Sequence, residues 1–304
     1  MTVAFARRLQ KNLRRLGPWA QKNGITCFRI FDRDLPEVPL ALDIYSDVDD
    51  VKWLHATLFE PRHGIDQASF DAWIAVANAA LSIPAAFTSK KRRAPGAQSD
   101  KLANTAQRIR VREAGCALLV NLFDYVDTGL FLDHRQTRAL VRAESQGKRV
   151  LNLFAYTGAF SVQAAAGGAK QTVSVDLSET YARWATENLA RNGFASSEHF
   201  VVVSDVLEFL AADASRFDLV VIDPPTISNS KRASSFQVQR DHSRLIGGAL
   251  SRLAPAGSII FSTNFQAFKL ELGDDVKVAE ITEATVPIDF PRRPPIHRAW
   301  RIKK

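Results

Sequence analysis

Cysteine is scarce in this chain of 304 residues. Its two cysteines, Cys27 and Cys116, are too few for a disulfide scaffold and too far apart for a CxxC metal site. We therefore expect two buried thiols in a cytoplasmic protein, with no bound metal. No run of 18 apolar residues occurs, which argues against a membrane-spanning helix. Fifteen glycines and 13 prolines are too few for a collagen-like or low-complexity chain, so the length predicts two globular domains.

Basic side chains outnumber acidic ones, 40 against 32, and they gather at two places. The first 22 residues carry six basic side chains and no acidic one, and a second group occupies residues 90–93. The nearby Pro95-Gly96 pair predicts a turn beside this second group. Such patches suit a polyphosphate partner, because they release its counterions on binding. A solvated surface without a partner fits the same pattern.

The first 115 residues predict a helix followed by a small α+β domain. Apolar residues at helical spacing predict a basic amphipathic helix in residues 1–24, and the missing apolar core argues against a secretory signal. An organelle transit peptide would share this pattern, but no cleavage site is evident, and we favour a retained helix. We expect the accessory domain to span residues 25–115. It combines strands at 26–31, 40–45, 51–58, 85–89 and 109–113 with a helix at 70–81.

From residue 116 to residue 304 the pattern becomes a regular alternation of strands and helices, after a hairpin expected from 118–124 and 129–132. Strands rich in Val, Ile and Leu between amphipathic helices indicate an α/β domain with a mostly parallel sheet and helices on both faces. The expected strands are 149–154, 172–176, 200–204, 217–222 and 258–262, and the expected helices are 136–145, 160–166, 179–192, 206–212 and 242–253.

Polar residues follow four successive strands of this domain. The first strand runs into residues 155–158, and the next three end at Asp176, Asp205 and Asp223. Ligands of open α/β sheets bind beyond the carboxyl ends of the strands. A single strand-end aspartate is often a helix cap, but several in register predict a binding site.

The turn at residues 155–158 does not suit a pyrophosphate. It contains Gly158, but Phe160 and Gln163 stand where G-x-G-x-x-G needs glycine, and no P-loop Gly-Lys-Ser/Thr is present. We therefore expect a nucleoside without a pyrophosphate, with its ribose on Asp176 and its base near Asp205. S-adenosylmethionine fits this description.

Several motifs resemble those of class I methyltransferases that act on RNA: NLFAYTGAF at 152–160, DLS at 176–178 and DPPTISNSKR at 223–232. More narrowly, GLFLDHRQTR at 129–138, FSTNFQAFKL at 261–270 and IHRAWRI at 296–302 resemble RlmK-type guanine-N7 methyltransferases of bacterial large-subunit (23S) rRNA. In many bacteria that enzyme is the C-terminal half of the bifunctional RlmKL. FRIFDRDLP at 28–36 extends the resemblance over nearly the whole chain.

The resemblance implies a Rossmann-like class I methyltransferase domain, S-adenosylmethionine as cofactor, and large-subunit rRNA as partner, either naked or in an assembly intermediate. The expected cofactor-binding residues are Asn152, Phe154, Tyr156, Thr157, Gly158, Asp176, Leu177, Asp205 and Val206. The expected catalytic residues are Asp223, Pro224, Pro225 and Thr226. The expected RNA contacts are Arg7, Arg8, Lys11, Lys90, Lys91, Arg92, Arg93, Asn229 and Lys231.

Guanine N7 has a free lone pair at neutral pH, so its methylation needs no general base. A carboxylate near the acceptor stabilises the positive charge that moves onto the purine, and Asp223 is the expected group, although it could instead only shape its turn. Cytosine-C5 methylation needs a thiolate, and no cysteine follows Cys116. Guanine-N2 or adenine-N6 methylation and a non-catalytic nucleic-acid-binding module remain open. We expect His134 to be a structural histidine without a role in proton transfer.

Overall fold

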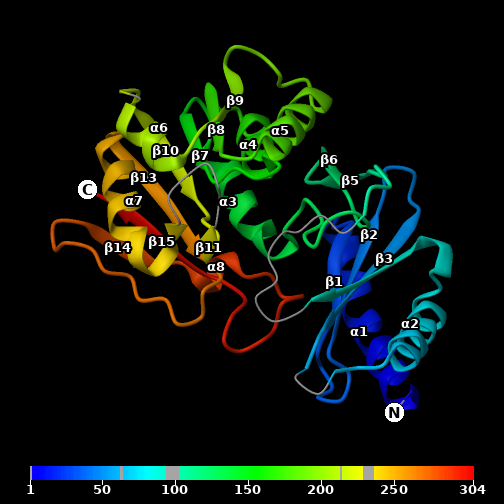
Figure 1. Ribbon diagram of the computed structural model, residues 1–304. Coiled ribbons are helices and arrows are strands. Elements are labelled where there is room, and N and C mark those ends of the chain that lie inside the picture. Colours follow the sequence, from blue (N-terminus) through cyan, green and yellow to red (C-terminus); the bar gives the residue numbers. More distant parts are fainter. Residues whose placement is uncertain (1, 62–63, 94–102, 213, 229–235) are drawn as a thin grey trace. The chain divides into compact units, whose positions relative to one another are not determined.

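The computed structural model describes residues 2–61, 64–93, 103–212, 214–228 and 236–304 (Figure 1). The chain forms two compact units, Met1–Leu132 and Asp133–Lys304, which are described separately below. Both cysteines are free and buried, as expected. No helix among the described residues has the length and apolar character needed to cross a membrane.

The first unit is built on a four-stranded sheet in the order β1-β2-β3-β4. Helices α1 and α2 pack together against it, and Phe5, Leu9 and Leu16 of α1 are buried in the shared core. The N-terminal helix is therefore an integral part of this unit. Its elements are α1 (Thr2–Lys22), β1 (Cys27–Asp32), β2 (Leu40–Ser46), β3 (Lys52–Phe59), α2 (Gln67–Leu81), η1 (Ala85–Phe87), β4 (Thr88–Arg93), β5 (Ile109–Glu113) and β6 (Cys116–Val120).

The hairpin expected from 118–124 and 129–132 is wrong. Strand β6 instead pairs antiparallel with β5, and the connection is the Ala114-Gly115 pair, whose φ angles are 48° and 82°. Two consecutive positive φ angles are what a tight hairpin turn requires, and glycine adopts one at no steric cost. The pairing keeps β6 with the first unit, so the units divide after Leu132 and not at the expected 115/116 boundary.

The strand expected at 85–89 is also displaced. Residues 85–87 form the short helix η1, and β4 covers Thr88–Arg93, so the basic group 90–93 lies on a strand and not in a turn. Strand β4 pairs parallel with β3. Because side chains alternate between the two faces of a strand, the four basic residues cannot all face solvent.

The second unit contains a seven-stranded sheet in the order β14-β15-β13-β10-β7-β8-β9. The five strands from β13 to β9 are parallel, and β15 is antiparallel to both of its neighbours, as Figure 1 shows. Its elements are η2 (Leu132–His134), α3 (Arg135–Glu144), β7 (Arg149–Leu153), α4 (Ala159–Ala166), β8 (Gln171–Asp176), α5 (Glu179–Arg191), β9 (His199–Val203), α6 (Val206–Ala212), β10 (Phe217–Ile222), β11 (Ile227–Ser228), β12 (Phe236–Gln237), α7 (Val238–Ser251), β13 (Leu253–Thr263), β14 (Lys277–Glu280), α8 (Thr282–Thr285) and β15 (Arg298–Lys303).

Helices cover both faces of this sheet, which confirms the predicted fold class. On one face, Val220 and Ile222 of β10 join a core with residues of α6 and α7. On the other face, Leu219 and Val221 pack with residues of α3 and α4. The alternation along β10 explains why its sequence is apolar at every one of these positions, since both faces are buried.

Candidate functional site

The order of the strands creates a crevice at the carboxyl edge of the sheet. The chain runs from β7 outward to β8 and β9 and then returns to place β10 on the other side of β7. A reversal of this kind parts the loops that follow the two central strands, and ligands of doubly wound sheets bind there. The turn after β7 and the Asp223 segment after β10 therefore flank the crevice, with Asp176 one strand further along.

The turn after β7 is tightly curled. Phe154, Tyr156 and Gly158 all have positive φ, at 55°, 51° and 73°. A Cβ atom added to Gly158 would lie 2.8 Å from the Cβ of Ala185 on α5, so only glycine fits without displacing that helix. The buried Asn188 of α5 also donates its side-chain N–H to the Thr157 carbonyl over 2.8 Å. Helix α5 thus fixes the shape of the turn.

Asp176 ends β8 and points its carboxylate at this turn. Oδ2 accepts the Tyr156 backbone N–H over 2.8 Å, and Oδ1 accepts that of Ser178 over 2.9 Å. A carboxylate has about four acceptor positions, so two remain for donors from a ligand. Burial raises the pKa of Asp176, although the two backbone hydrogen bonds oppose that shift. A desolvated carboxylate with spare acceptor positions fits the paired hydroxyls of a ribose.

Three of the predicted cofactor residues have structural partners. Asn152 is buried in β7 and donates to Ser161 Oγ over 3.0 Å, and Thr157 is also buried. Asp205 accepts the backbone N–H groups of Leu207 and Glu208, and this caps α6. These contacts shape the edge of the site from within.

The other predicted cofactor residues differ in exposure. Phe154 and Tyr156 are partly exposed, and their rings contact Phe236 and Tyr181 at centroid distances of 5.2 and 4.5 Å. Leu177 is partly exposed beside Asp176, whereas Val206 is buried in the core at the start of α6. Phe154, Tyr156 and Leu177 therefore have side-chain surface that a ligand can reach.

The DPPT segment follows β10. Asp223 is partly exposed, and its Oδ1 accepts a 2.7 Å hydrogen bond from Ser262 Oγ on the neighbouring strand β13. Pro224 is buried and Pro225 exposed. Thr226 Oγ1 donates to Asn264 Oδ1 over 2.8 Å, and its carbonyl accepts the Val238 N–H at the start of α7. The segment is thus held at both ends, with one carboxylate oxygen, Oδ2, not engaged by Ser262.

A polar cluster that the sequence analysis missed lies behind Asp223. His134 Nε2 is 3.4 Å from Asp223 Oδ2 and 3.7 Å from Asp133 Oδ2. Asp133 in turn contacts His297 Nδ1 over 2.9 Å. The three residues Asp133, His134 and His297 are buried, and their ligand-capable atoms lie within 4.8 Å of one another. His134 and His297 are too far apart in sequence for any local pattern to have joined them.

The predicted basic group on β4 is largely engaged within the first unit. Lys90 pairs with Asp71 over 2.7 Å, Arg92 pairs with Glu60, and Arg93 lies 3.7 Å from Asp127. The prediction that Lys91 contacts RNA is wrong for this structure, because its side chain is buried and burial lowers its pKa to about 8. Asn229 and Lys231 lie outside the described residues.

The basic residues of α1 have a different environment. Arg7 and Lys11 are exposed and Arg8 is partly exposed, on the side of the helix away from its buried apolar residues. Arg14 and Arg15 are exposed as well. Because α1 contains no acidic residue, no ion pair forms along the helix itself. The described surface of the first unit therefore offers α1 as its uncompensated basic face.

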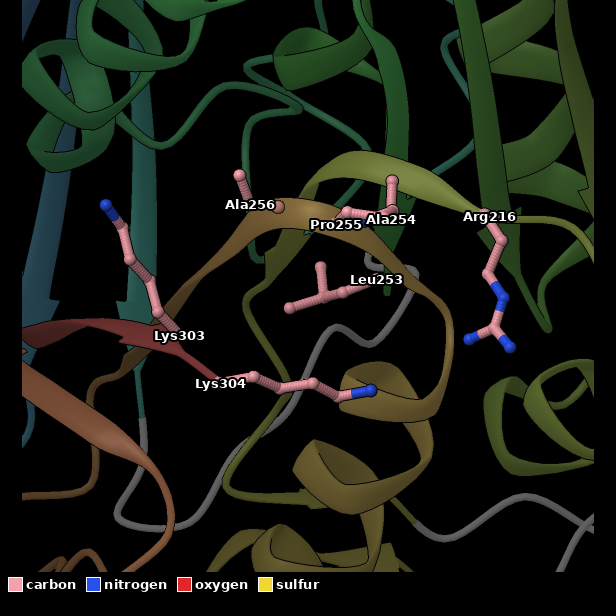
Figure 2. Close-up of a pocket in the computed structure, with 8 residues that line it drawn as sticks. Arg216, Leu253, Ala254, Pro255, Ala256, Lys303 and Lys304 are labelled. Atoms are coloured by element: carbon pink, nitrogen blue, oxygen red, sulfur yellow. The ribbon is translucent and has the colours of Figure 1, made fainter.

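A hollow of about 410 Å³ lies at the other end of the sheet (Figure 2). It lies beside the first residues of β13 and the segment before β10, whereas Asp223 and Ser262 follow or end those strands. It is therefore separate from the crevice described above. It is lined by Arg216, Leu253, Ala254, Pro255, Ala256, Gly257, Lys303 and Lys304.

Comparisons with known proteins agree with this geometry. Residues 64–293 match the S-adenosylmethionine-dependent methyltransferase family. The chain belongs to that family. S-adenosylmethionine is accordingly its cofactor, and the spare acceptor positions of Asp176 fit the ribose of that molecule.

Among curated relatives, this methyltransferase is 46% identical over 309 residues to the ribosomal RNA large subunit methyltransferase K/L of Stutzerimonas stutzeri. It is also 46% identical over 308 residues to the K/L protein of Pseudomonas aeruginosa. Each alignment covers 98% of this chain and 42% of the relative. The chain therefore spans less than half the length of these proteins.

Solved structures share the fold of this methyltransferase. SMU.776 in complex with SAH has a TM-score of 0.79 at 24% identity, covering 100% of this chain and 82% of that chain. The SAM-dependent methyltransferase of Agrobacterium tumefaciens has a TM-score of 0.57 at 16% identity, covering 87% of each chain. The high coverage by SMU.776 shows that both kinds of unit, the small sheet and the large one, recur in that protein.

Proposed function

We propose that this methyltransferase transfers a methyl group to guanine N7 in bacterial large-subunit (23S) rRNA. The observation that carries the chemistry is the Asp223 carboxylate, which lies across the switch point from the cofactor turn and is fixed by Ser262. The identity of 46% over 98% of the chain to proteins named for large-subunit rRNA supports the class of acceptor. The motifs at 129–138, 261–270 and 296–302 support N7 as the atom.

The residues divide the work as follows. The bound cofactor supplies a methyl group on a sulfonium. Asp176 accepts the ribose hydroxyls, and the curled turn after β7 sets the depth at which the cofactor enters. Alignment of methyl and acceptor then accounts for much of the rate, because the transfer is an in-line displacement.

Asp223 acts on the acceptor side. Positive charge moves onto the purine as N7 takes the methyl group, and a fixed carboxylate stabilises that charge without reorganising. The Pro224-Pro225 pair restricts the backbone of the loop that carries this carboxylate, and Thr226 anchors it to Asn264. No residue has to remove a proton, since N7 is unprotonated.

Two other acceptors are compatible with the same carboxylate. The N–H of guanine N2 or adenine N6 can donate to Asp223, so these atoms are the competing targets within the same enzyme class. A non-catalytic nucleic-acid-binding module is the alternative outside that class. The intact Asp176 and Asp223 carboxylates and their supporting hydrogen bonds favour an enzyme.

Identification of the methylated nucleoside tests the proposal. Purified protein, methyl-labelled S-adenosylmethionine and unmodified 23S rRNA are expected to yield labelled 7-methylguanosine after nuclease digestion and mass spectrometry. Labelled N2-methylguanosine or N6-methyladenosine would move the assignment to an exocyclic amine. Calorimetric binding of the cofactor with no label in any RNA, naked or in large-subunit assembly intermediates, would support the non-catalytic module.

Helix α1 is expected to supply phosphate contacts. A triple variant with Arg7→Gln, Lys11→Gln and Arg14→Gln should flatten the dependence of RNA affinity on salt by about 0.7 to 0.9 log units per lost contact. The measurement is the slope of log affinity against log salt concentration. Cofactor affinity should stay unchanged.

A triple variant of β4 is the matched comparison, with Lys90→Gln, Arg92→Gln and Arg93→Gln. Its salt slope should change less, because these side chains already pair with Asp71, Glu60 and Asp127. A parental slope for the α1 variant together with a flattened slope for the β4 variant would place the RNA on β4 instead.

A further inference from the structure

A continuous line of polar contacts leads from the interior of the second unit to Asp223. Thr285 Oγ1 lies 3.2 Å from His297 Nε2, and His297 Nδ1 lies 2.9 Å from Asp133 Oδ2. The same carboxylate oxygen is 3.7 Å from His134 Nε2, which is 3.4 Å from Asp223 Oδ2. The line joins α8, the segment before β15 and the start of α3 to the loop after β10.

The ring of His134 is held in one orientation. It stacks on the His297 ring at a centroid distance of 4.1 Å and an interplanar angle of 10°. Phe160 of α4 meets it edge to face at 5.8 Å. Its Nδ1 lies 3.2 Å from the hydroxyl oxygen of the buried Thr137. With its neighbours packed in this way, the ring cannot turn Nε2 away from Asp223 without disrupting the core.

The chemistry of these contacts assigns the hydrogen on the ring. Burial lowers the pKa of His134, an effect that His297 and Arg138 reinforce and that Asp223 and Asp133 oppose. The ring is therefore neutral at neutral pH and carries one N–H. A carboxylate only accepts hydrogen bonds, so Nε2 is the donor and Nδ1 accepts from the Thr137 hydroxyl.

We propose that His134 is a positioning residue that donates from Nε2 to Asp223 Oδ2 and, together with Ser262, fixes the carboxylate that faces the acceptor base. The inference rests on the proposed role of Asp223. Asp133 and His297 hold the ring, since His297 Nδ1 lies against the Asp133 oxygen that would otherwise compete for the His134 N–H. A neutral donor orients the carboxylate and leaves its negative charge for the methylated purine.

A pair of amide substitutions tests the proposal. His134→Gln places an amide N–H close to the position of Nε2, whereas the shorter His134→Asn does not reach it. We expect His134→Asn to lower the single-turnover rate about 10-fold or more, as for loss of a hydrogen bond to a charged group. His134→Gln should recover most of that rate. Cofactor affinity and the KM for RNA should stay within about two-fold for both variants, because the contact acts on the chemical step.

His242→Asn is the matched control for the removal of a buried histidine. His242 lies on α7, contacts the Gln239 carbonyl through Nδ1 and accepts the Glu271 N–H at Nε2, and its printed contacts do not include Asp223. Its loss should lower thermal stability with little change in the single-turnover rate of the folded fraction. Equal impairment of His134→Gln and His134→Asn, or a parental rate for His134→Asn, would overturn the proposal.

A double variant separates this inference from the proposed function. If the contact acts through Asp223, then adding His134→Asn to Asp223→Asn should cause no further loss of rate, whereas independent effects would multiply. Full activity of Asp223→Asn would refute the catalytic carboxylate itself. An impaired Asp223→Asn beside a fully active His134→Asn would refute only the role of His134.

A chelator distinguishes positioning from metal binding by the same cluster. The activity is expected to be unchanged by EDTA, because His134 is assigned to hydrogen bonds with Thr137 and Asp223. Loss of activity in EDTA with recovery on adding zinc alone would assign Asp133, His134 and His297 to a metal and overturn the proposal.

Discussion

Asp223→Asn is expected to lower the rate of methyl transfer by about 100-fold or more while the affinity for S-adenosylmethionine stays within about two-fold. The substitution keeps the shape of the side chain and its acceptor oxygen for Ser262, but it removes the negative charge. Single-turnover transfer to saturating rRNA measures the chemical step, and calorimetry measures cofactor binding. A loss confined to the rate would be typical of an interaction made in the transition state.

Asp274→Asn is the control for this experiment. Asp274 is an exposed carboxylate in the loop before β14, so its neutralisation changes the net charge equally and should leave the rate unaltered. A parental rate for Asp223→Asn would show that this aspartate only shapes its turn. In that case the acceptor would be activated by position alone.

Asp176→Ala is expected to weaken S-adenosylmethionine binding by about 100-fold or more. The change removes the acceptor for the ribose hydroxyls, and each hydrogen bond to a charged group is worth about 1.5–3 kcal/mol. It also removes the acceptor of the Tyr156 and Ser178 N–H groups, which hold the turn. Asp176→Asn keeps one acceptor oxygen and should show an intermediate loss. Calorimetric titration of the cofactor checks both variants.

The same carboxylate predicts the direction of a pH effect. Burial raises the pKa of Asp176 in the cofactor-free protein, and ribose hydroxyls favour its ionised form. Cofactor affinity should therefore fall as the pH is lowered through that raised pKa, and Asp176→Asn should lose this dependence. Glu187→Gln, which alters an exposed α5 ion pair with Arg191, should behave as the parent does. Equal pH dependence in all three proteins would remove Asp176 from the cofactor site.

The parallel part of the fold is predictable from the sequence because its signals are local. Strands buried on both faces are continuous runs of Val, Ile and Leu, and residues 217–222 coincide with β10 as observed. Helix α3 begins and ends one residue from the expected 136–145. The positions of Asp176 and Asp223 at one edge follow from the parallel arrangement alone.

The antiparallel elements are less accessible because pairing is decided by distant partners. Nothing in residues 298–303 shows that β15 lies between β13 and β14, and the apolar run at 118–124 gave no sign that β6 pairs with the preceding strand. Lys91 is a similar case. Its burial follows from the pairing of β4 with β3 and the alternation of side chains, neither of which a run of four basic residues reveals.

The site could be predicted only in part for the same reason. Asp176 and Asp223 carry a visible strand-end pattern, and Asp205 shares it although it caps α6. The contacts of His134 with Asp223 and of His297 with Asp133 arise from packing between segments far apart in the chain. A lone histidine in each of two motifs gives no indication of this arrangement.

The central place of β15 has a consequence for biosynthesis. This strand forms hydrogen bonds with both β13 and β14, so the sheet cannot be completed while residues 298–303 are still inside the translating ribosome. Until then β13 has an open edge, which is a hazard for pairing with other nascent chains. His297 directly precedes β15 and reaches Asp133 only when that strand has inserted. Release of the finished polypeptide and assembly of the polar cluster are thus coupled in time.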